Sequence, residues 1–448
     1  MKEKVGNNMK VAVAGTGYVG LVTGVALAHI GHQVTCVDVD KEKIEIMKKG
    51  ISPIYEQDLE KLMKENEERL DYTLDYQKAY KDAEVIIIGV GTPEREDGSA
   101  NLDYVYSVCK QIASSLEKDC VVVLKSTVPI GTNDEIEKML NQLVKPNIKV
   151  YVASNPEFLA QGTAVHDTLY ASRIVVGTED EHAAEVMQKL YEPLTKEPYN
   201  VPYLHTSRRS AEMIKYASND FLALKISYIN EIANLCKKLG ANIEEVSKGM
   251  GYDPRIGNKF LKAGIGYGGS CFPKDTKALH WLSKVKGVEI ETIKACIDVN
   301  KKQKLVLFHE LLNDLKDLNG KTIAVLGLTF KPGTDDLRDA PSIDNISLLL
   351  DYGAKVKAYD PVGIENFKKK IQFKLSEDGI KGSIEFFDNI DECIKDAEAT
   401  LIMTEWPEIV NYDINKYSKL MQTPRVYDGR NCYQLEDTKN IIYSSIGR

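Results

Sequence analysis

Short apolar runs alternate with longer segments of helical spacing along the first third of the chain. Near-continuous apolar runs are typical of strands that are buried on both faces of a parallel sheet. We predict strands at Lys10 to Ala14, Gln33 to Val39, Glu84 to Val90, Val121 to Lys125 and Val150 to Ala153. A helix is predicted over Leu21 to Ile30, between the first two of these strands. This alternation predicts a doubly wound α/β domain.

A much longer helical pattern follows, from Ala211 to Leu239, with apolar residues at three- and four-residue spacing. A helix of this length between two α/β units suggests a dimerisation spine. The strand–turn–helix–strand order then returns, with Thr322 to Leu326 as its first strand. We therefore expect an α/β fold of two Rossmann-like doubly wound domains joined by a long central helix with a helical dimerisation region, divided as 9–207, 208–305 and 320–448.

Composition narrows the class of protein. The chain has 448 residues, 43% hydrophobic and 28% charged, and its net charge is −8. The negative charge and the lack of basic runs argue against a nucleic-acid partner. No apolar run reaches the ~18 residues of a membrane span. The polar stretch Met1 to Asn8 is expected to be a short disordered lead and has no signal-peptide core.

The eight cysteines are scattered along the chain. None forms a Cys-x-x-Cys pair or joins a histidine at zinc spacing, so we expect no metal site. This usage is typical of reduced thiols in a cytoplasmic protein.

The first candidate site is the run Gly15-Thr16-Gly17-Tyr18-Val19-Gly20, between the first predicted strand and helix. Its glycines allow a tight turn and the close approach of a pyrophosphate to a helix N-terminus. Asp38, at the end of the next strand, is placed to accept hydrogen bonds from a ribose 2′-OH and would repel a 2′-phosphate. The pattern predicts an NAD site. Lys43 is a further candidate for the ribose, with a solvated lysine as the alternative.

Polar residues also follow the later strands, at the sheet edge where doubly wound folds bind ligands. Thr92 is a candidate cofactor neighbour, and Thr127 is a candidate to hold a water or a ribose hydroxyl. Helix capping is the alternative for both. Glu157 is a candidate base or substrate ligand, against the alternative of a solvated loop acid.

The densest candidate chemistry lies in Gly266-Tyr267-Gly268-Gly269-Ser270-Cys271-Phe272-Pro273-Lys274-Asp275. The glycines permit close approach of a ligand, and the proline stiffens the turn. Cys271 is a candidate nucleophile if a positive charge such as Lys274 lowers its pKa. Asp275 is a candidate to orient a water or a proton donor. A tight turn with a small buried cysteine is the alternative.

Two further pairs are weaker candidates. Lys215 and Asn219 are four residues apart on the long helix and so share a face, although a surface pair would do the same. Lys331 and Arg338 follow the first strand of the last domain, and we expect them to contact a phosphate or the other domain.

Taken in order, these motifs resemble those of the UDP-glucose 6-dehydrogenases, within the UDP-glucose/GDP-mannose dehydrogenase family. The resemblance runs from Met9 to Arg448. It is carried by 15–20, 91–93, 125–129, 155–159, 211–215 with Asn219, 266–275, 327–332 and 428–430. It implies oxidation of C6 of UDP-glucose to UDP-glucuronate with two NAD⁺, in a cytoplasmic homodimer.

The resemblance also implies roles for residues. Cys271 matches the nucleophile, Lys215 and Asn219 the pair that stabilises an oxyanion, Thr127 and Asp275 the residues that position the hydrolytic water, and Glu157 an active-site carboxylate. The residues that match cofactor contacts are Gly15, Gly17, Tyr18, Val19, Gly20, Asp38, Lys43, Thr92, Thr127, Gln161, Lys274 and Arg338. Those that match substrate contacts are Glu157, Phe158, Leu159, Ala160, Gln161, Lys215, Asn219, Arg255, Phe260, Leu261, Lys262, Ala263, Gly264, Gly268, Lys331 and Arg430, with Arg255 reaching a neighbouring subunit's substrate.

One position departs from the family's pattern. Relatives commonly carry a second glutamate where this chain has Gln161, and an amide cannot take a proton, so we assign acid–base duty to Glu157. The sequence Ser270-Cys271-Phe272-Pro273-Lys274-Asp275 favours UDP-glucose over a UDP-N-acetylhexosamine, which is the alternative substrate. A non-catalytic NAD-binding scaffold is the alternative from another class.

Overall fold

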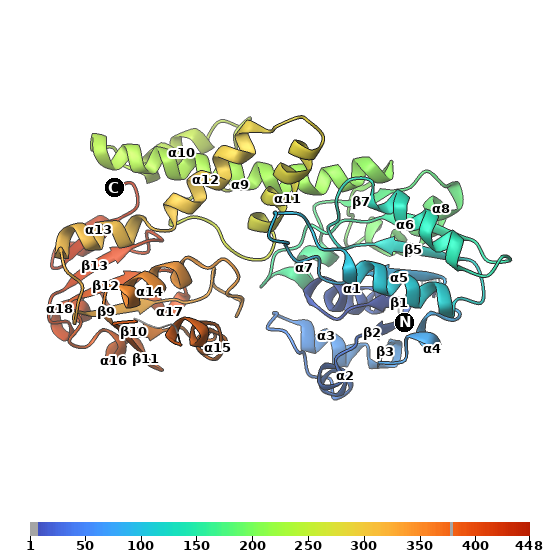
Figure 1. Ribbon diagram of the computed structural model, residues 1–448, viewed down its shortest axis with the longest axis horizontal. Coiled ribbons are helices and arrows are strands. Elements are labelled where there is room, and N and C mark those ends of the chain that lie inside the picture. Colours follow the sequence, from blue (N-terminus) through green and yellow to red (C-terminus); the bar gives the residue numbers. More distant parts are fainter. Residues whose placement is uncertain (1–7, 377–379) are drawn as a thin grey trace. The chain divides into compact units, whose positions relative to one another are not determined.

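The computed structural model describes residues 8–376 and 380–448. Apart from Asn8, the polar lead predicted at the N-terminus lies outside the described residues. The chain divides into two compact units, residues 1–218 and 219–448, which are coloured blue to green and green to red in Figure 1. The long helix α9 (Arg208–Leu239) contributes residues to both.

The first unit contains an eight-stranded sheet in the order β3-β2-β1-β4-β5-β6-β7-β8. The first six strands are parallel, β7 meets β6 in antiparallel direction, and β8 is parallel to β7. The order 3-2-1-4-5-6 is that of the dinucleotide-binding fold. The strands are β1 (Lys10–Ala14), β2 (Gln33–Val37), β3 (Leu70–Thr73), β4 (Val85–Ile88), β5 (Cys120–Leu124), β6 (Val150–Ser154), β7 (Ile174–Gly177) and β8 (Tyr203–Thr206).

Helices pack on both faces of this sheet. They are α1 (Tyr18–His29), α2 (Lys41–Lys48), α3 (Leu59–Glu65), α4 (Tyr76–Tyr80), α5 (Asp103–Ser115), α6 (Thr132–Leu143), α7 (Ala164–Leu169) and α8 (Glu181–Thr195). Alternate residues of one strand enter different cores: Val11 and Val13 pack in the core that includes α1, whereas Ala12 and Ala14 pack in the core that includes α5 and α6. Burial on both faces explains why these strands are apolar throughout.

The second unit contains a six-stranded sheet in the order β11-β10-β9-β12-β13-β14, in which all pairs are parallel. Counted along its own chain, this order is again 3-2-1-4-5-6. The fold class predicted from the sequence, two Rossmann-like domains with a long central helix, is therefore confirmed. The strands are β9 (Thr322–Leu326), β10 (Lys355–Tyr359), β11 (Ser383–Phe386), β12 (Ala399–Ile402), β13 (Arg425–Asp428) and β14 (Ile442–Ser445).

The helices of the second unit fall into two groups. The helices that precede its sheet are α10 (Ile243–Gly251), α11 (Phe272–Val285), α12 (Glu291–Gln303) and α13 (Val306–Leu315). Those that connect its strands are α14 (Pro341–Asp351), α15 (Ile364–Leu375), α16 (Ile390–Ile394), α17 (Pro407–Val410) and α18 (Asn415–Leu420). Ile323 and Val325 of β9 enter one core, and Ala324 and Leu326 the other.

Several predicted boundaries differ from the structure by one to three residues; β4, for example, is Val85–Ile88 where Glu84 to Val90 was predicted. The long helix begins at Arg208, three residues before the predicted start. Strand β2 ends at Val37, because the next residue, Asp38, turns its carboxylate to the loop after β1.

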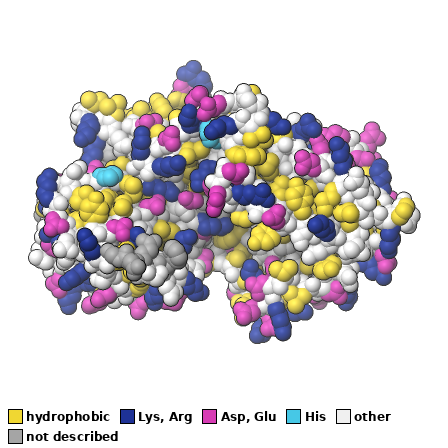
Figure 2. Space-filling model, viewed as in Figure 1, with side chains coloured by type: hydrophobic (Ala, Val, Ile, Leu, Met, Phe, Trp, Pro, Cys, Tyr) yellow, Lys and Arg dark blue, Asp and Glu magenta, His cyan; other side chains and the backbone are white. Residues whose placement is uncertain are grey.

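On the face shown in Figure 2, basic and acidic side chains are interspersed. None of the helices in residues 8–376 and 380–448 has the combined length and apolar character that a membrane crossing requires.

Candidate active site

The glycine loop after β1 has the geometry of a dinucleotide cradle. Gly15 has a φ of +91°, and a Cβ built on Gly20 would lie 1.9 Å from the carbonyl oxygen of Gly15. These two glycines are therefore required by the turn itself. A Cβ on Gly17 would meet no protein atom within 4 Å, so the space above Gly17 is open. The first-turn amides of α1 have no intrahelical acceptors, which suits a pyrophosphate.

Asp38 is tied directly to this loop. Its Oδ2 accepts hydrogen bonds from the amide of Thr16 at 2.7 Å and from the Thr16 hydroxyl at 2.5 Å. Desolvation raises the pKa of Asp38, but these bonds, the amide of Asp40 and the charge of Lys43 outweigh it, so the pKa is lowered. An ionised carboxylate therefore lies beside the loop, as recognition of a free ribose 2′-OH requires.

The ends of β4 and β5 are joined by hydroxyl groups. The Thr92 hydroxyl donates to the carbonyl of Thr127 at 2.9 Å, and the Ser126 hydroxyl donates to the carbonyl of Val90 at 2.6 Å. Thr92 and Thr127, predicted as candidates separately, are thus neighbours at one edge of the sheet.

Glu157 and Lys215 form a buried ion pair in the first unit. The Lys215 ammonium donates to Glu157 Oε1 at 2.8 Å and to the Glu157 carbonyl at 2.7 Å, and the two side chains are 3% and 6% exposed. The other carboxylate oxygen accepts the amide of Leu159 at 2.9 Å. The pair that the sequence left as isolated candidates is therefore one group, in which the acid is already hydrogen-bonded.

Lys125 is a functional candidate that the sequence analysis did not single out. Its ammonium donates to Asn155 Oδ1 at 3.0 Å inside the first unit. Desolvation, helped by the charge of Lys215 and opposed by that of Glu157, lowers the pKa of Lys125 to about 8. Its position in the Lys-Ser-Thr-Val-Pro motif was the available signal, but burial beside a second lysine is visible only in the fold.

The loop after Glu157 is held from both sides. The Arg173 guanidinium lies 3.8 Å above the Phe158 ring, which is a cation–π contact. The amide of Gly162, next to the half-buried Gln161, donates to Glu56 Oε2 at 2.7 Å. Arg173 and Glu56 were not predicted from the sequence, because neither lies in the motif that it contacts: Glu56 is 106 residues from Gly162 in the chain, and Arg173 follows the Phe158 loop.

In the second unit, Cys271 lies directly before α11 and is half-buried. One helical turn on, the almost fully buried Asp275 accepts from Lys274 Nζ at 2.6 Å and from Asn219 Nδ2 at 2.7 Å. The Arg338 guanidinium also interacts electrostatically with Cys271. Lys274 itself is paired with Asp275, and its activation of the Cys271 thiol stays a prediction.

The backbone before Cys271 requires its glycines. A Cβ on Gly268 would lie 2.5 Å from the carbonyl oxygen of Asp339, and one on Gly269 would lie 2.8 Å from the Phe330 ring. Asn300 of α12 clamps the same loop, since its Oδ1 accepts from the Tyr267 amide at 2.8 Å and its Nδ2 donates to the Tyr267 carbonyl at 3.0 Å.

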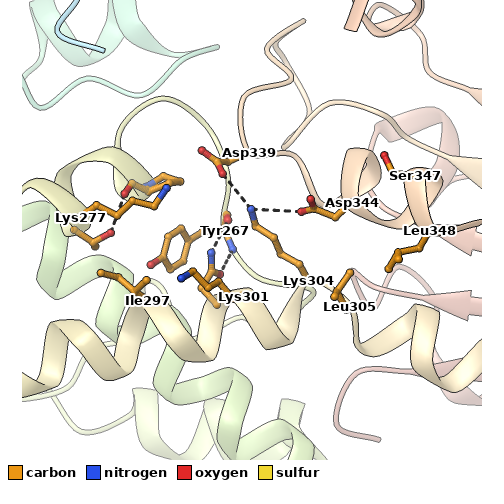
Figure 3. Close-up of a pocket in the computed structure, with 13 residues that line it drawn as sticks. Tyr267, Lys277, Ile297, Lys301, Lys304, Leu305, Asp339, Asp344, Ser347 and Leu348 are labelled. Atoms are coloured by element: carbon orange, nitrogen blue, oxygen red, sulfur yellow. Dashed lines mark hydrogen bonds and ion pairs between the residues drawn. The ribbon is translucent and has the colours of Figure 1, made fainter. Parts of the chain in front are cut away.

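A cavity of about 480 Å³ lies beside this loop and is lined by Tyr267 together with residues of α11, α12 and α14. Figure 3 shows Lys304 between two acids there, 3.4 Å from Asp339 and 3.8 Å from Asp344. Tyr267 of the cysteine loop therefore faces this cavity, while Asn300 holds its backbone through two hydrogen bonds.

The remaining predicted substrate residues of the second unit differ in their partners. Arg430 donates to the carbonyls of Met403, Gly266 and Phe330 at 2.8, 3.3 and 3.2 Å, so it ties the cysteine loop to the second sheet. Phe260 has a φ of +64° and is 40% exposed, at the start of the predicted 260–264 segment.

Two predicted arginines are each held by an acid two residues away. Arg338 binds Asp336 through two nitrogens, and Arg255 binds Asp253 in the same way. The Arg255 side chain is 87% exposed. Lys331 lies with its ammonium 5.7 Å from the Phe330 ring.

The glycine loop, its paired acid and the two doubly wound sheets place the protein in the class of NAD-binding dehydrogenases with two Rossmann-like domains. Three family models match along the chain: the UDP-glucose/GDP-mannose dehydrogenase NAD binding domain at 9–195, central domain at 209–302 and UDP binding domain at 324–435. The chain belongs to the UDP-glucose/GDP-mannose dehydrogenase family.

Individual relatives cover the whole chain. It is 47% identical to the UDP-glucose 6-dehydrogenase YwqF of Bacillus subtilis (strain 168), over 98% of both chains. The fold is similar to that of a UDP-glucose dehydrogenase from Pyrobaculum islandicum, with a TM-score of 0.90 and 33% identity over 100% and 99% of the two chains. A UDP-D-ManNAc dehydrogenase from Pyrococcus horikoshii has a TM-score of 0.85 and 27% identity, over 98% and 99%.

Proposed function

We propose that the protein oxidises UDP-glucose at C6 to UDP-glucuronate in a four-electron reaction through a Cys271 thiohemiacetal and thioester. Family membership and 47% identity to a UDP-glucose 6-dehydrogenase support the substrate class. The observation that carries the mechanism is the arrangement of Cys271 one helical turn before a carboxylate that is held by an ammonium and an amide.

The balanced reaction is UDP-glucose + 2 NAD⁺ + H₂O to UDP-glucuronate + 2 NADH + 3 H⁺, with the new carboxyl group ionised. When bound, NAD⁺ would supply the hydride acceptor for each of the two oxidations at C6. In the first, the C6 hydroxyl loses its proton, and we assign the acceptor role to the Glu157 end of the buried ion pair. The Cys271 thiolate then forms a bond to the aldehyde carbon, and the resulting oxyanion is stabilised by Lys215 and Asn219.

Oxidation of the thiohemiacetal leaves a thioester. A water held by Thr127 and Asp275 adds to the thioester carbon, gives its proton to Asp275, and displaces the Cys271 thiolate. Covalent capture keeps the aldehyde in the site between the two oxidations. Because Asp275 accepts hydrogen bonds from two donors, its carboxylate is fixed in orientation for that water.

The predicted binding residues form the rest of the proposal. The cofactor would be held by the glycine loop, Asp38, Lys43, Thr92, Gln161, Lys274 and Arg338, and the UDP-sugar by 157–161, 260–264, Gly268, Lys331 and Arg430. The openness above Gly17 fits the pyrophosphate. We retain the three-domain division 9–207, 208–305 and 320–448, which the ranges of the family models support.

We further propose a homodimer in the cytoplasm. Phe221, Tyr228 and Leu235 recur at seven-residue spacing on α9 and are 61%, 51% and 53% exposed, which forms an apolar stripe on one helix face. The exposed Arg255 is free of the core and suits the role of reaching a partner's substrate. The mass in solution of the wild type and of Tyr228→Lys tests this arrangement.

The test of the reaction is the NADH yield per UDP-glucose consumed. We expect two NADH per sugar for the wild type, almost no steady turnover for Cys271→Ala, and normal turnover for Cys432→Ala, a half-buried cysteine of the same unit. One NADH per sugar would contradict the thioester route. Turnover only with a UDP-N-acetylhexosamine would keep the chemistry and change the substrate, and no turnover with either sugar would favour a scaffold.

A further inference from the structure

Asp220 is an unusual carboxyl group in the second unit. It follows Asn219 on α9 and is only 2% exposed. Neither of its carboxylate oxygens has a hydrogen-bond partner within the described part of the chain. By contrast, the buried Glu212 accepts three hydrogen bonds, two from Asn133 and one from Gly131. A buried carboxylate without donors is strongly disfavoured, whereas a carboxylic acid in the same place is not.

The surroundings of Asp220 strengthen this argument. Four ionisable groups interact electrostatically with Asp220. They are Asp275 and Lys274 of α11, Tyr267 of the cysteine loop and Cys296 of α12. The cation among them, Lys274, is already paired with Asp275 at 2.6 Å. With Asp220 protonated, Lys274, Asp275 and Asp220 together carry no net charge, and with Asp220 ionised they carry a charge of −1.

We propose that Asp220 is a positioning residue for the reaction proposed above, a neutral carboxylic acid that keeps the cluster of Asp220, Lys274 and Asp275 uncharged overall. The inference rests on that proposed function. Thiolate formation at Cys271 and addition of water to a thioester both place negative charge one helical turn from Asp275. A second ionised carboxylate in this cluster would oppose both steps through space. Asp220 thus acts through Asp275 and touches no reacting atom in this scheme.

Ionisation of Asp220 should then limit activity at alkaline pH. Burial and the charge of Asp275 raise the pKa of Asp220 to about 8, against a smaller opposing effect of Lys274. We expect the kcat of the wild type to fall as the pH passes through about 8. In Asp220→Asn, which keeps the shape of the neutral acid, this fall should be lost, so the ratio of activity at pH 9 to that at pH 7 should rise at least about threefold. An unchanged alkaline limb would overturn the proposal.

A second measurement reads the proton without turnover. A carboxyl group with a folded-state pKa above its unfolded value binds more protons when folded, so stability falls as the pH rises between the two values. The advantage of Asp220→Asn over the wild type in urea unfolding should therefore grow from pH 5 to pH 8. Asp391→Asn, which alters an exposed carboxylate paired with Lys416, should show no such growth. A constant difference would overturn the assignment.

The two experiments separate this inference from the proposed function. If the wild type does not oxidise UDP-glucose, the proposed function and the catalytic part of the inference fall together, while the urea series still decides the protonation of Asp220. If the variant does not fold, infrared spectra of the wild type decide: a protonated-carboxyl carbonyl band that is lost through about pH 8 supports the proposal, and its absence at pH 7 overturns it.

Discussion

One ammonium group, that of Lys215, binds both the side-chain carboxylate and the main-chain carbonyl of a single residue, Glu157. The lysine therefore fixes the rotamer of the acid and the path of its backbone at once. With both side chains almost fully buried, neither charge has water as a substitute partner. The pair is at the same time a structural tie and the proposed acid–base group.

The first prediction concerns removal of one partner of this pair. Lys215→Met leaves the Glu157 charge buried and uncompensated, so we expect a loss of about 3–5 kcal/mol in the free energy of unfolding together with loss of turnover. Urea denaturation and steady-state assays measure the two effects. The double variant Lys215→Met/Glu157→Leu should regain most of the stability and none of the activity. Equal instability of the single and double variants would contradict a desolvated-charge origin.

The second prediction separates two glycines of the cofactor loop. Gly17→Ala should fold normally, because its Cβ meets no protein atom, yet should raise the KM for NAD at least about tenfold by occupying the pyrophosphate's space. Gly20→Ala is the matched control: its Cβ would lie 1.9 Å from a carbonyl oxygen, so we expect a large loss of thermal stability. A Gly17→Ala protein with unchanged NAD kinetics would place the pyrophosphate elsewhere.

The third prediction concerns the choice of dinucleotide. Asp38→Ala removes the acceptor for the ribose 2′-OH and the repulsion of a 2′-phosphate, so NAD should bind about 10-fold more weakly and the preference over NADP should shrink. Comparison of kcat/KM for the two dinucleotides measures this. Asp40→Asn, a neighbouring acid that caps α2, should leave the preference unchanged. Should Asp38→Ala retain the wild-type preference, the acid has no part in it.

The fourth prediction follows from the buried Lys125. Its pKa of about 8 lies below the ordinary value of 10.5, so the unfolded chain binds more protons between these pH values and stability rises with pH in that window. Lys125→Met should lack this rise when unfolding free energies are compared at pH 7.5, 9 and 10. Lys149→Met, at a lysine that is 60% exposed, should follow the wild type. Parallel curves for Lys125→Met and wild type would rule out the shifted lysine.

Local patterns allowed the sequence to predict much of this protein. The glycine loop, the first strand and Asp38 lie within 29 residues of one another, and their spacing specifies the turn, the helix and the acid together. The second Rossmann-like domain was predicted from the repeated order of strands and helices even though its loop lacks the same glycines. Element ends were predicted less well than the elements themselves, and at the end of β2 the reason is visible: Asp38 accepts hydrogen bonds from Thr16 in the loop after β1.

The residues of the candidate site that could not be predicted from the sequence share one physical reason. Lys125 and Asp220 are notable for burial among other charges, and Asn300 for a clamp on a peptide 33 residues away. A lysine or an aspartate on a helix or a strand end is ordinarily solvated, so its residue type carries no sign of burial. Such sites arise only when tertiary packing removes water from a polar group.

The clamp of Asn300 on Tyr267 also bears on protein engineering. The curve of the cysteine loop is enforced by a side chain from a separate helix, together with the carbonyl and ring that exclude a Cβ at Gly268 and Gly269. A graft of the ten-residue loop alone into another scaffold would carry Cys271 without the contacts that hold its backbone in this shape. The smallest portable module is the loop with α12 and the Phe330 turn, so the backbone geometry around Cys271 belongs to this assembly and not to the ten-residue motif alone.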